Sequence, residues 1–440
     1  MLMLTEFVNG STSRHSFWPR VREFAVPPSM IEIATARRAA GDWVGACAAA
    51  GFDVDIDLRR LARTRGGELA ARVRADLRHL APDLLRWHMP RIAPDGLLRP
   101  GLTIALARYD PGRVGGRAGF VYLVARTAPV WADAGQRIGL ALWDGAEFGG
   151  GSHPHPRPDR RFRLDLHRHL WDARRSGDLR FRTGTPDRWA DEARILLDAE
   201  EQQGNTFLIR RGSRRRMIAE LVEGDDGPSV RPAPGHPAGG ISALPVLPDA
   251  ATWTAPDLVL LRDGDISADR LHPLVAAALV PGYEPSESDR ATTGSERARL
   301  VECRGEQHRI GLVDGVLTAL DHDPVELRRE ELLVALTGTP LPCLQVIDRA
   351  HRNPDCLTGV RERLDHGDTA GALAIVDELL GAGAQLRDGA LRDELEAFAD
   401  QRITYGLYRA GLSLPVPRGP MRPRPRPRDR RGHPRHATVH

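Results

Sequence analysis

The order of the hydrophobic patterns along the chain constrains its fold more than any other feature. Apolar residues such as Leu69, Val73 and Leu77 recur at helical spacing in the first hundred residues. Beyond residue 99, short runs rich in Val, Ile, Leu and Tyr are separated by Gly, Pro and Asp, which predicts antiparallel strands. Helical spacing returns after residue 323. We therefore expect an α+β fold with a helical N-terminal part, an antiparallel β-rich mixed middle region, a C-terminal helical bundle and a disordered Pro/Arg tail.

Breaks in these patterns divide the 440 residues into segments. The predicted segments are an irregular N-terminal segment (1–26), a helical N-terminal region (27–98), a mixed β-rich domain (99–222), a linker (223–240), a second mixed region that ends in a β-meander (241–322), a C-terminal helical bundle (323–411) and a disordered basic tail (412–440). The meander is predicted from strands at 299–303, 308–313 and 316–320, because Asp314-Gly315 favours a two-residue hairpin turn.

One short motif occurs twice. Residues 41–48 and 367–374 both read Gly-Asp-x-x-Gly-Ala-x-Ala. In each copy we expect one helix to end at the glycine and the aspartate to cap the next. Two copies so far apart do not make a stacked repeat, so the motif indicates either common ancestry or merely a common kind of helix break.

All 62 basic residues are arginine, and the chain contains no lysine. Lysine is needed for the Schiff base of pyridoxal phosphate enzymes and for the phosphate-binding loop of many nucleotide hydrolases. We therefore expect neither pyridoxal phosphate nor a P-loop nucleotide. The abundance of Arg, Ala, Gly and Pro predicts a bacterial gene with a high GC content.

The positive charge is concentrated at the end of the chain. Residues 411–440 contain eight arginines and one aspartate, a net charge of +7, which leaves −4 for the rest of the chain because the total is +3. Nucleic-acid contact is therefore predicted only through residues 418–435, where arginines alternate with prolines and can meet phosphates without reading sequence.

The sequence also predicts a cytoplasmic location. Its apolar runs are shorter than the roughly 18–20 residues that span a bilayer, so no membrane contact is expected. The N-terminal residues lack the apolar centre of a signal peptide. The four cysteines include no Cys-x-x-Cys pair, which favours reduced thiols in a reducing compartment.

Four histidines in the segment 153–169 form the main candidate metal site. Imidazole and carboxylate groups are zinc ligands, and this segment offers both. The candidate ligands are His153, His155, Asp165, His167 and His169, with Asp172 nearby. Histidines two positions apart on a helix do not face one another, so solvated surface histidines are the preferred interpretation and zinc is not expected.

Two further groups offer candidate sites. Asp53, Asp55 and Asp57 would lie on one face of a strand and hold a cation, or they are an exposed polar edge beside a helix start. Cys303 and His308 would approach each other across a hairpin as a nucleophile and base, or Cys303 is simply buried.

Asp321-His322-Asp323 has an acid–base interpretation, but Asp323-Pro324 also opens a capping box for a helix. We prefer the capping role. The chain has no catalytic motif with a familiar spacing, so we assign no catalytic residue and expect no enzyme.

The function predicted from the sequence is that of a non-enzymatic adaptor, regulatory or partner-binding protein, whose partner is another protein. One alternative is a metal-dependent hydrolase that uses the cluster from His153 to His169. The other is nucleic-acid contact through the arginine tail.

Overall fold

The computed structural model forms two compact units. Unit 1 comprises residues 1–286 and 405–440, and unit 2 comprises residues 287–404. The described residues are 17–110, 119–145, 153–182, 185, 188–211, 215–225, 227–235, 240–280, 282–283, 299–303, 305–313, 316–337, 341–352, 354, 356–381, 383–412 and 438–439.

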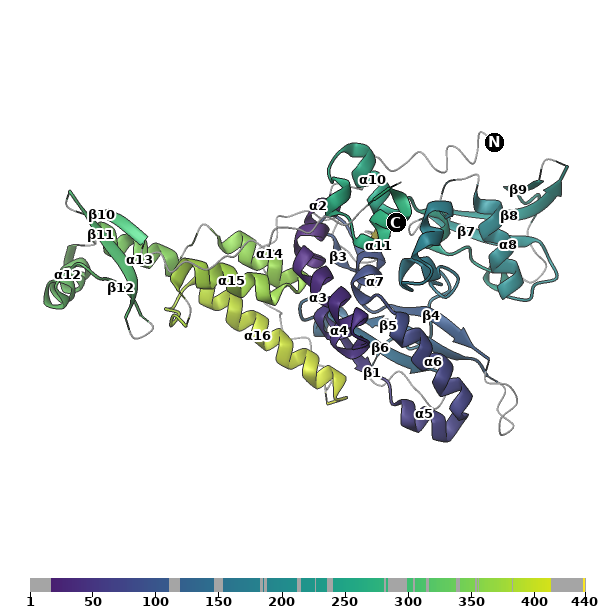
Figure 1. Ribbon diagram of the computed structural model, residues 1–440, viewed down its shortest axis with the longest axis horizontal. Helices are drawn as coiled ribbons and strands as arrows, with labels where there is room; N and C mark the ends of the chain where they lie inside the picture. The colour runs from purple at the N-terminus through teal and green to yellow at the C-terminus, as the bar shows by residue number, and fades with distance from the viewer. Residues whose placement is uncertain are drawn as a thin grey trace. The chain divides into compact units, whose positions relative to one another are not determined.

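A four-stranded sheet lies at the centre of unit 1 (Figure 1). Its order is β1 (Phe52–Asp55), β6 (Ile138–Trp143), β5 (Val121–Thr127) and β4 (Thr103–Tyr109). β1 runs parallel to β6, and the other pairs are antiparallel. The strands are buried over most of their length, because helices cover the sheet with Leu, Val, Ala and Trp side chains.

The helices of unit 1 precede, separate and follow the strands of this sheet along the chain. They are α2 (Trp18–Arg20), the π-helical turn η1 (Val21–Ala25), α3 (Pro28–Ala39), α4 (Trp43–Ala49), α5 (Leu58–Arg65), α6 (Gly67–His79), α7 (Pro82–His88), α8 (Trp189–Ala199), α9 (Asp249–Thr252), α10 (Pro256–Asp263) and α11 (Pro273–Leu279). Short 3-10 turns occupy Val130–Ala132, Arg168–Leu170, Ser176–Phe181, Ile241–Ala243 and Ala268–Arg270.

Two smaller sheets complete unit 1. β7 (Thr206–Arg211), β8 (Arg215–Gly224) and β9 (Gly227–Pro232) form an antiparallel sheet whose inner face packs on α8 (Figure 1). β2 (Arg91–Ile92) pairs with β3 (Leu97–Leu98) and with β13 (Thr438–Val439). β9 lies within residues 223–240, which the sequence predicts to be a linker.

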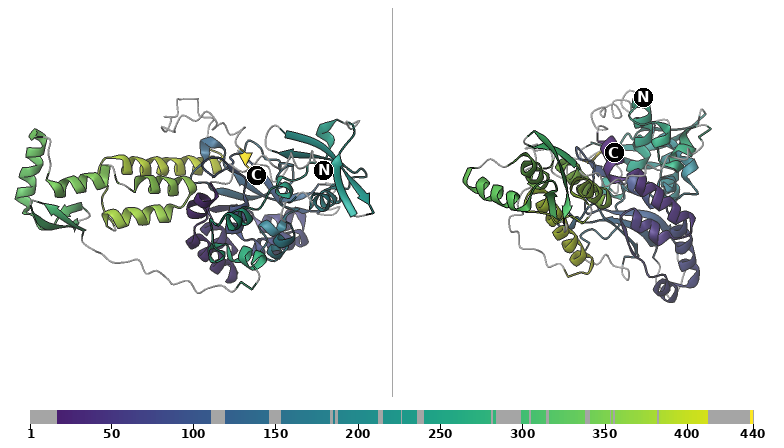
Figure 2. Two further views of the ribbon diagram at one scale, coloured as in Figure 1. Left: turned by 90° about the horizontal axis from the view of Figure 1, so that it is seen from above. Right: turned by 60° about the vertical axis from the view of Figure 1, so that its left-hand side comes forward.

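Unit 2 combines a meander with helices (Figures 1 and 2). Its strands are β10 (Arg299–Cys303), β11 (Glu306–Val313) and β12 (Val316–Ala319), all antiparallel in chain order. Its helices are α12 (Pro324–Thr337), α13 (Pro342–Arg352), α14 (Leu357–His366), α15 (Thr369–Leu380) and α16 (Ala390–Arg409). The part of α16 from Tyr405 onward belongs to unit 1. A core of Ile, Leu, Val and Phe side chains joins the meander to α13–α16.

Helices at both ends and antiparallel sheets between them confirm the predicted α+β fold class. The predicted tail lies outside the described residues except for Leu412 and β13. The predicted region 241–322 is divided between the two units.

The prediction of irregular structure before residue 27 is wrong for residues 18–25, which form α2 and η1. Phe17, Val21 and Ala25 are spaced four apart and are buried. This burial stabilises a turn of helix that the local sequence alone does not indicate.

The repeated motif folds in the same way at both positions. The Asp42 carboxylate accepts a hydrogen bond from the Gly45 N–H at 2.8 Å, and Asp368 accepts one from Gly371 at 2.9 Å. A Cβ atom on either of these glycines would lie 2.1 Å from the capping carboxylate. The motif is therefore a compact helix break, in which the aspartate cap leaves no room for a side chain three residues later.

No helix in the described part of the chain combines the length and the apolar character that a membrane crossing requires.

Candidate metal centre

The β-meander of unit 2 presents a cysteine and a histidine on the face that packs against α13. Cys303 is the last residue of β10, and His308 on β11 lies opposite Val301. Because side chains alternate along a strand, Val301, Cys303 and His308 share one face of the sheet. α13 packs against β10 and β12 and contributes Cys343 from its first turn. Cys303 and Cys343 are fully buried in one small cluster.

Three side chains converge at this junction. The ligand atoms of Cys303, His322 and Cys343 all lie within 4.8 Å of one another. The Sγ of Cys343 lies 3.5 Å from Nε2 of His322. Two ligands of a tetrahedral zinc ion, with bonds of about 2.3 Å to sulfur and 2.0–2.1 Å to nitrogen, would be about 3.5 Å apart. The observed spacing therefore fits a bound ion. Among the described residues this is the only such group of three His, Cys, Asp or Glu side chains.

Local structure explains how Cys343 reaches this position. Pro342 is the first residue of α13, where its missing N–H costs nothing, and Cys343 follows it. The partial positive charge of a helix N-terminus favours a thiolate over a thiol. Without an ion, however, burial and the nearby Cys303 thiol raise the pKa of Cys343 to about 12. A metal would have to displace a proton from this sulfur, so its affinity would rise with pH.

His308 stacks against His322, the imidazole member of the three converging groups. The rings of His308 and His322 stack with their centroids 4.2 Å apart and an angle of 11° between their planes. The Nδ1 atom of His308 is buried, and no hydrogen-bond partner for it exists among the described residues. The stack fixes the plane of His322 and places a second imidazole beside the three converging groups.

The acidic neighbours of His322 have other partners. Asp321 accepts hydrogen bonds from the backbone and side chain of Arg309, and the side-chain contact is the main cause that lowers its pKa to about 2. Asp323 accepts from the Val325 N–H at 2.9 Å and so caps α12. The capping role is therefore as the sequence indicates, while His322 is directed to Cys343 instead of to either aspartate.

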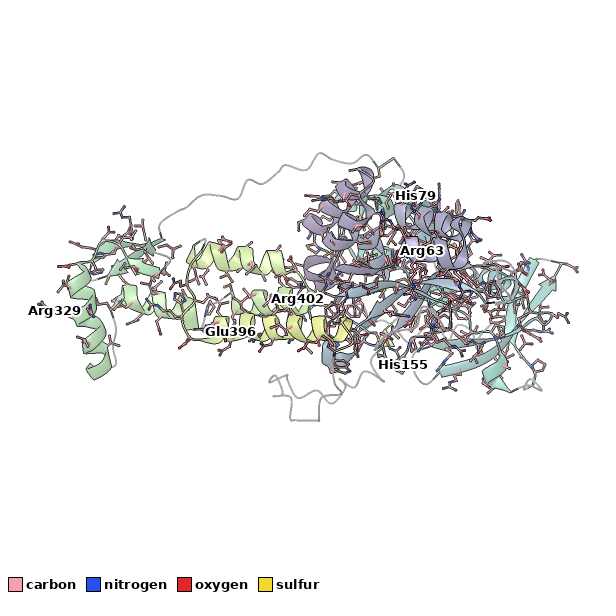
Figure 3. All side chains as sticks on the ribbon, turned by 90° about the horizontal axis from the view of Figure 1, so that it is seen from below. Arg63, His79, His155, Arg329, Glu396 and Arg402 are labelled. Carbon is pink, nitrogen blue, oxygen red and sulfur yellow. The ribbon has the colours of Figure 1, made fainter. Side chains whose placement is uncertain are left out.

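The predicted cluster of four histidines is dispersed over separate contacts in unit 1. His153 is buried, with Nε2 3.1 Å from the Thr127 carbonyl oxygen and Nδ1 accepting from the His155 N–H. His155 is exposed on the surface (Figure 3). Asp165 forms a bidentate ion pair with Arg163. His153 and Asp165 thus have protein partners of their own, and His155 is exposed.

His167 and His169 belong to a buried polar network with Glu192 and Arg182. Nδ1 of His167 lies 3.1 Å from the Arg163 carbonyl oxygen. Its Nε2 lies 3.1 Å from the Glu192 carboxylate, which Arg182 also contacts. The two imidazole centroids are 5.7 Å apart. Burial, together with the nearby His167 and Arg182, lowers the pKa of His169 well below its usual value, so His169 is neutral. Metal binding by this segment stays a prediction.

The carboxylates at residues 53, 55 and 57 are likewise engaged by protein groups, and Arg409 contacts both Asp53 and Asp55. Asp53 forms a bidentate pair with Arg137, with both N–O distances 2.6 Å, and accepts from the Tyr405 hydroxyl at 2.8 Å. Asp55 pairs with Arg409. Asp57 caps α5. Arginine and backbone N–H groups thus take the place that the cation hypothesis gives to a metal.

The sequence pointed to parts of the converging group but not to their combination. It paired Cys303 with His308, considered His322 only beside its own aspartates, and gave Cys343 no role. The three ligands are far apart along the chain, and their spacing matches no familiar zinc motif. The Pro-Cys start of a helix after a meander was the signal that could have drawn attention to Cys343.

Comparison of the chain with protein-family models, with curated proteins and with solved structures found no match.

Proposed function

We propose that unit 2 is a metal-stabilised binding module, and that the chain acts as a non-enzymatic partner-binding protein. The observation that carries this proposal is the convergence of Cys303, His322 and Cys343 within 4.8 Å at the junction of the meander and α13. Soft thiolate and imidazole ligands favour zinc over the hard cations magnesium and calcium. An ion bound there would tie β10 and the segment after β12 to α13.

The electrostatics of the group support a structural role over covalent catalysis. The nucleophile of a cysteine enzyme is the thiolate, whose pKa is lowered by its surroundings. The pKa of Cys343 is raised to about 12, so its thiol is neutral near pH 7. The hydrolase alternative requires the histidines of unit 1 to converge, and the contacts of His153 and His167 described above offer it no support.

Exposed apolar side chains support binding of a protein partner. Leu300 on the meander is 58% exposed, and Val325 and Leu332 on α12 are 58% and 66% exposed. Burial of such aliphatic surface against another apolar surface is favourable by about 25 cal/mol per Å². We infer that the partner is a protein with an apolar contact surface.

Elemental analysis of the purified, tag-free chain tests the metal site. We expect about one zinc per chain, lost in Cys303→Ser/Cys343→Ser and retained in the control Cys356→Ser, whose side chain lies outside the converging group. Equal zinc in the double variant and the wild type would place the ion elsewhere. A wild type without bound metal, even after refolding in zinc, would contradict the proposal.

The partner-binding role has its own test. A protein that co-purifies at a fixed ratio should be lost in Leu332→Arg, and retained in Val44→Arg, which places the same charge on an exposed apolar position of unit 1. Equal retention in both variants would exclude α12 as the contact surface.

A further inference from the structure

The β7–β8 hairpin of unit 1 carries a strong and one-sided charge. Residues 206–216 include five arginines, at positions 210, 211, 214, 215 and 216, and no acidic residue. Residues 220–226, at the far end of β8, include four acidic residues and no basic one. A ten-residue strand separates charges by about 30 Å, so the two ends of the β7–β9 sheet present opposite signs.

The strand register places like charges directly opposite each other at the basic end. Arg210 on β7 pairs with Arg216 on β8. Residues opposite each other in an antiparallel pair have Cβ atoms about 4.5–5.5 Å apart, and like charges there are destabilising. The fold therefore maintains a repulsive arrangement that an external anion would relieve.

The acidic end of the sheet, in contrast, is partly neutralised within the chain. Glu223 pairs with Arg194 at 2.8 Å, and Glu220 pairs with Arg231. Neither Arg210 nor Arg216 forms an ion pair with another described residue, and the Nε atom of Arg210 is buried without a hydrogen-bond partner among them. The positive charges of Arg210 and Arg216 are thus not neutralised by an ion pair with a described residue.

The nearest carboxylates do not compensate this charge. Asp249 is engaged by Arg161 through two hydrogen bonds, and Asp159 accepts from the Arg161 N–H. Burial, together with Arg161 and Arg216, lowers the pKa of Arg210 in spite of these two aspartates.

The composition of the hairpin favours phosphate groups over bases. Single-strand binding proteins stack bases on exposed aromatic side chains. The only aromatic residue between 206 and 216 is Phe207, which is fully buried in the sheet core. A two-stranded β-ribbon fits the major groove of a duplex, and arginine contacts phosphates without a requirement for base sequence.

We propose that the β7–β8 hairpin, through Arg210 and Arg216, binds the phosphate backbone of duplex nucleic acid without sequence preference. This activity is separate from the metal site of unit 2. It also differs from contact through the arginines of residues 418–435, because it places the interface on the folded body of unit 1.

The test measures binding of the full chain to a fluorescent 20-base-pair DNA duplex by anisotropy, at several salt concentrations. Each phosphate contact contributes about −0.9 to the slope of log K against log salt. Arg210→Gln/Arg216→Gln should therefore reduce the magnitude of the slope by about 1.8. The matched control is Arg59→Gln/Arg63→Gln, which removes the same charge from exposed positions of α5 and should leave the slope unchanged; Figure 3 labels Arg63. The single variant Arg216→Gln, at an exposed site, should reduce it by about 0.9 even if Arg210 affects folding.

The same variants are measured in a chain whose eight tail arginines are changed to glutamine. A hairpin effect that persists there supports the proposal. Equal slopes for the hairpin and control variants would overturn it and assign any binding to the tail. Binding to phosphatidylserine vesicles without binding to DNA, or loss of self-association in the hairpin variant without an effect on DNA, would overturn it in favour of a membrane surface or a second copy of the chain.

Discussion

The histidines of unit 1 and the cysteine–histidine group of unit 2 illustrate opposite relations between sequence and space. His153, His155, His167 and His169 lie in one short stretch of sequence, yet His153 and His155 lie in different surroundings and only His167 and His169 are neighbours. The ligands of unit 2 are spread along the chain from Cys303 to Cys343 and converge within 4.8 Å.

The two groups also differ in how their polar atoms are satisfied. In unit 1, several buried imidazoles lie beside carboxylates or carbonyl oxygens. The Nε2 of His272 lies 2.7 Å from Asp83, and that of His88 lies 3.5 Å from Asp257. In unit 2, two thiols and an imidazole face one another without a carboxylate among the converging groups. Buried histidines paired with acids stabilise a fold by themselves, whereas a group of soft ligands gains most from an ion.

Removal of the metal is expected to have the largest effect. With free zinc at about 1,000 times its dissociation constant, binding contributes about 4 kcal/mol to folding, and chelation or Cys303→Ser/Cys343→Ser should remove this from unit 2. All eight tryptophans lie in unit 1. Urea unfolding followed by far-UV circular dichroism should therefore show an earlier transition, while tryptophan fluorescence stays unchanged. An equal shift of the urea transition in circular dichroism and in tryptophan fluorescence would contradict the expectation that the metal stabilises unit 2 and not unit 1.

The substitution Glu192→Gln should lower the stability of unit 1. Glu192 is 5% exposed, and its hydrogen bonds with His167 and Arg182 outweigh burial and lower its pKa. Removing one member of a buried pair leaves uncompensated charge, at a cost of about 3 kcal/mol. Urea unfolding by tryptophan fluorescence should detect this loss, with zinc content unaltered. If zinc were lost too, the histidines of unit 1 would be implicated in metal binding after all.

The stability of unit 1 should change with pH by a smaller amount, and the change should be due to His153. Burial is the main cause that lowers the pKa of His153 from 6.5 to about 4. Between these values the unfolded chain binds a proton that the folded chain does not, so stability falls as the pH falls. From pH 7 to pH 5 the loss should be about 2 kcal/mol. His153→Gln should reduce the loss by that amount in urea titrations, and an unchanged pH profile would show that His153 is not buried as described.

The smallest effects should be equal in the two units. Asp42→Ala and Asp368→Ala each remove a helix cap from the same motif, at a cost of about 1 kcal/mol. The two aspartates also pair with an arginine five residues earlier, Arg37 and Arg363 respectively. Similar losses by circular dichroism would show that the local motif has the same energetics in both places. Unequal losses of stability would mean that tertiary contacts of the buried Asp368 also contribute to stability.

Much of the fold could be predicted from local patterns. The strands at 299–303 and 316–320, the helix start at Asp323-Pro324 and the Gly-Asp breaks all depend on residues a few positions apart. Helix at 18–25 could not be predicted in this way, because it depends on burial of Phe17 and Val21 in the core. The candidate site escaped prediction for a related reason, since no local rule connects the end of one strand with the start of a helix far beyond it in the chain.

The sequence by itself determined the type of most main elements, the aspartate caps at which helices begin, the dependence on arginine for every permanent side-chain positive charge and the opposite charges at the two ends of β8. These properties arise from side chains and neighbours within about one turn or one strand. Only the tertiary structure decided which polar groups meet. The hairpin register sets Cys303 and His308 on one face, and packing of α13 against that face brings Cys343 to His322. Burial of apolar surface, which is not directional, drives this packing, so the meeting of the ligands follows from the whole core of unit 2 and not from their spacing.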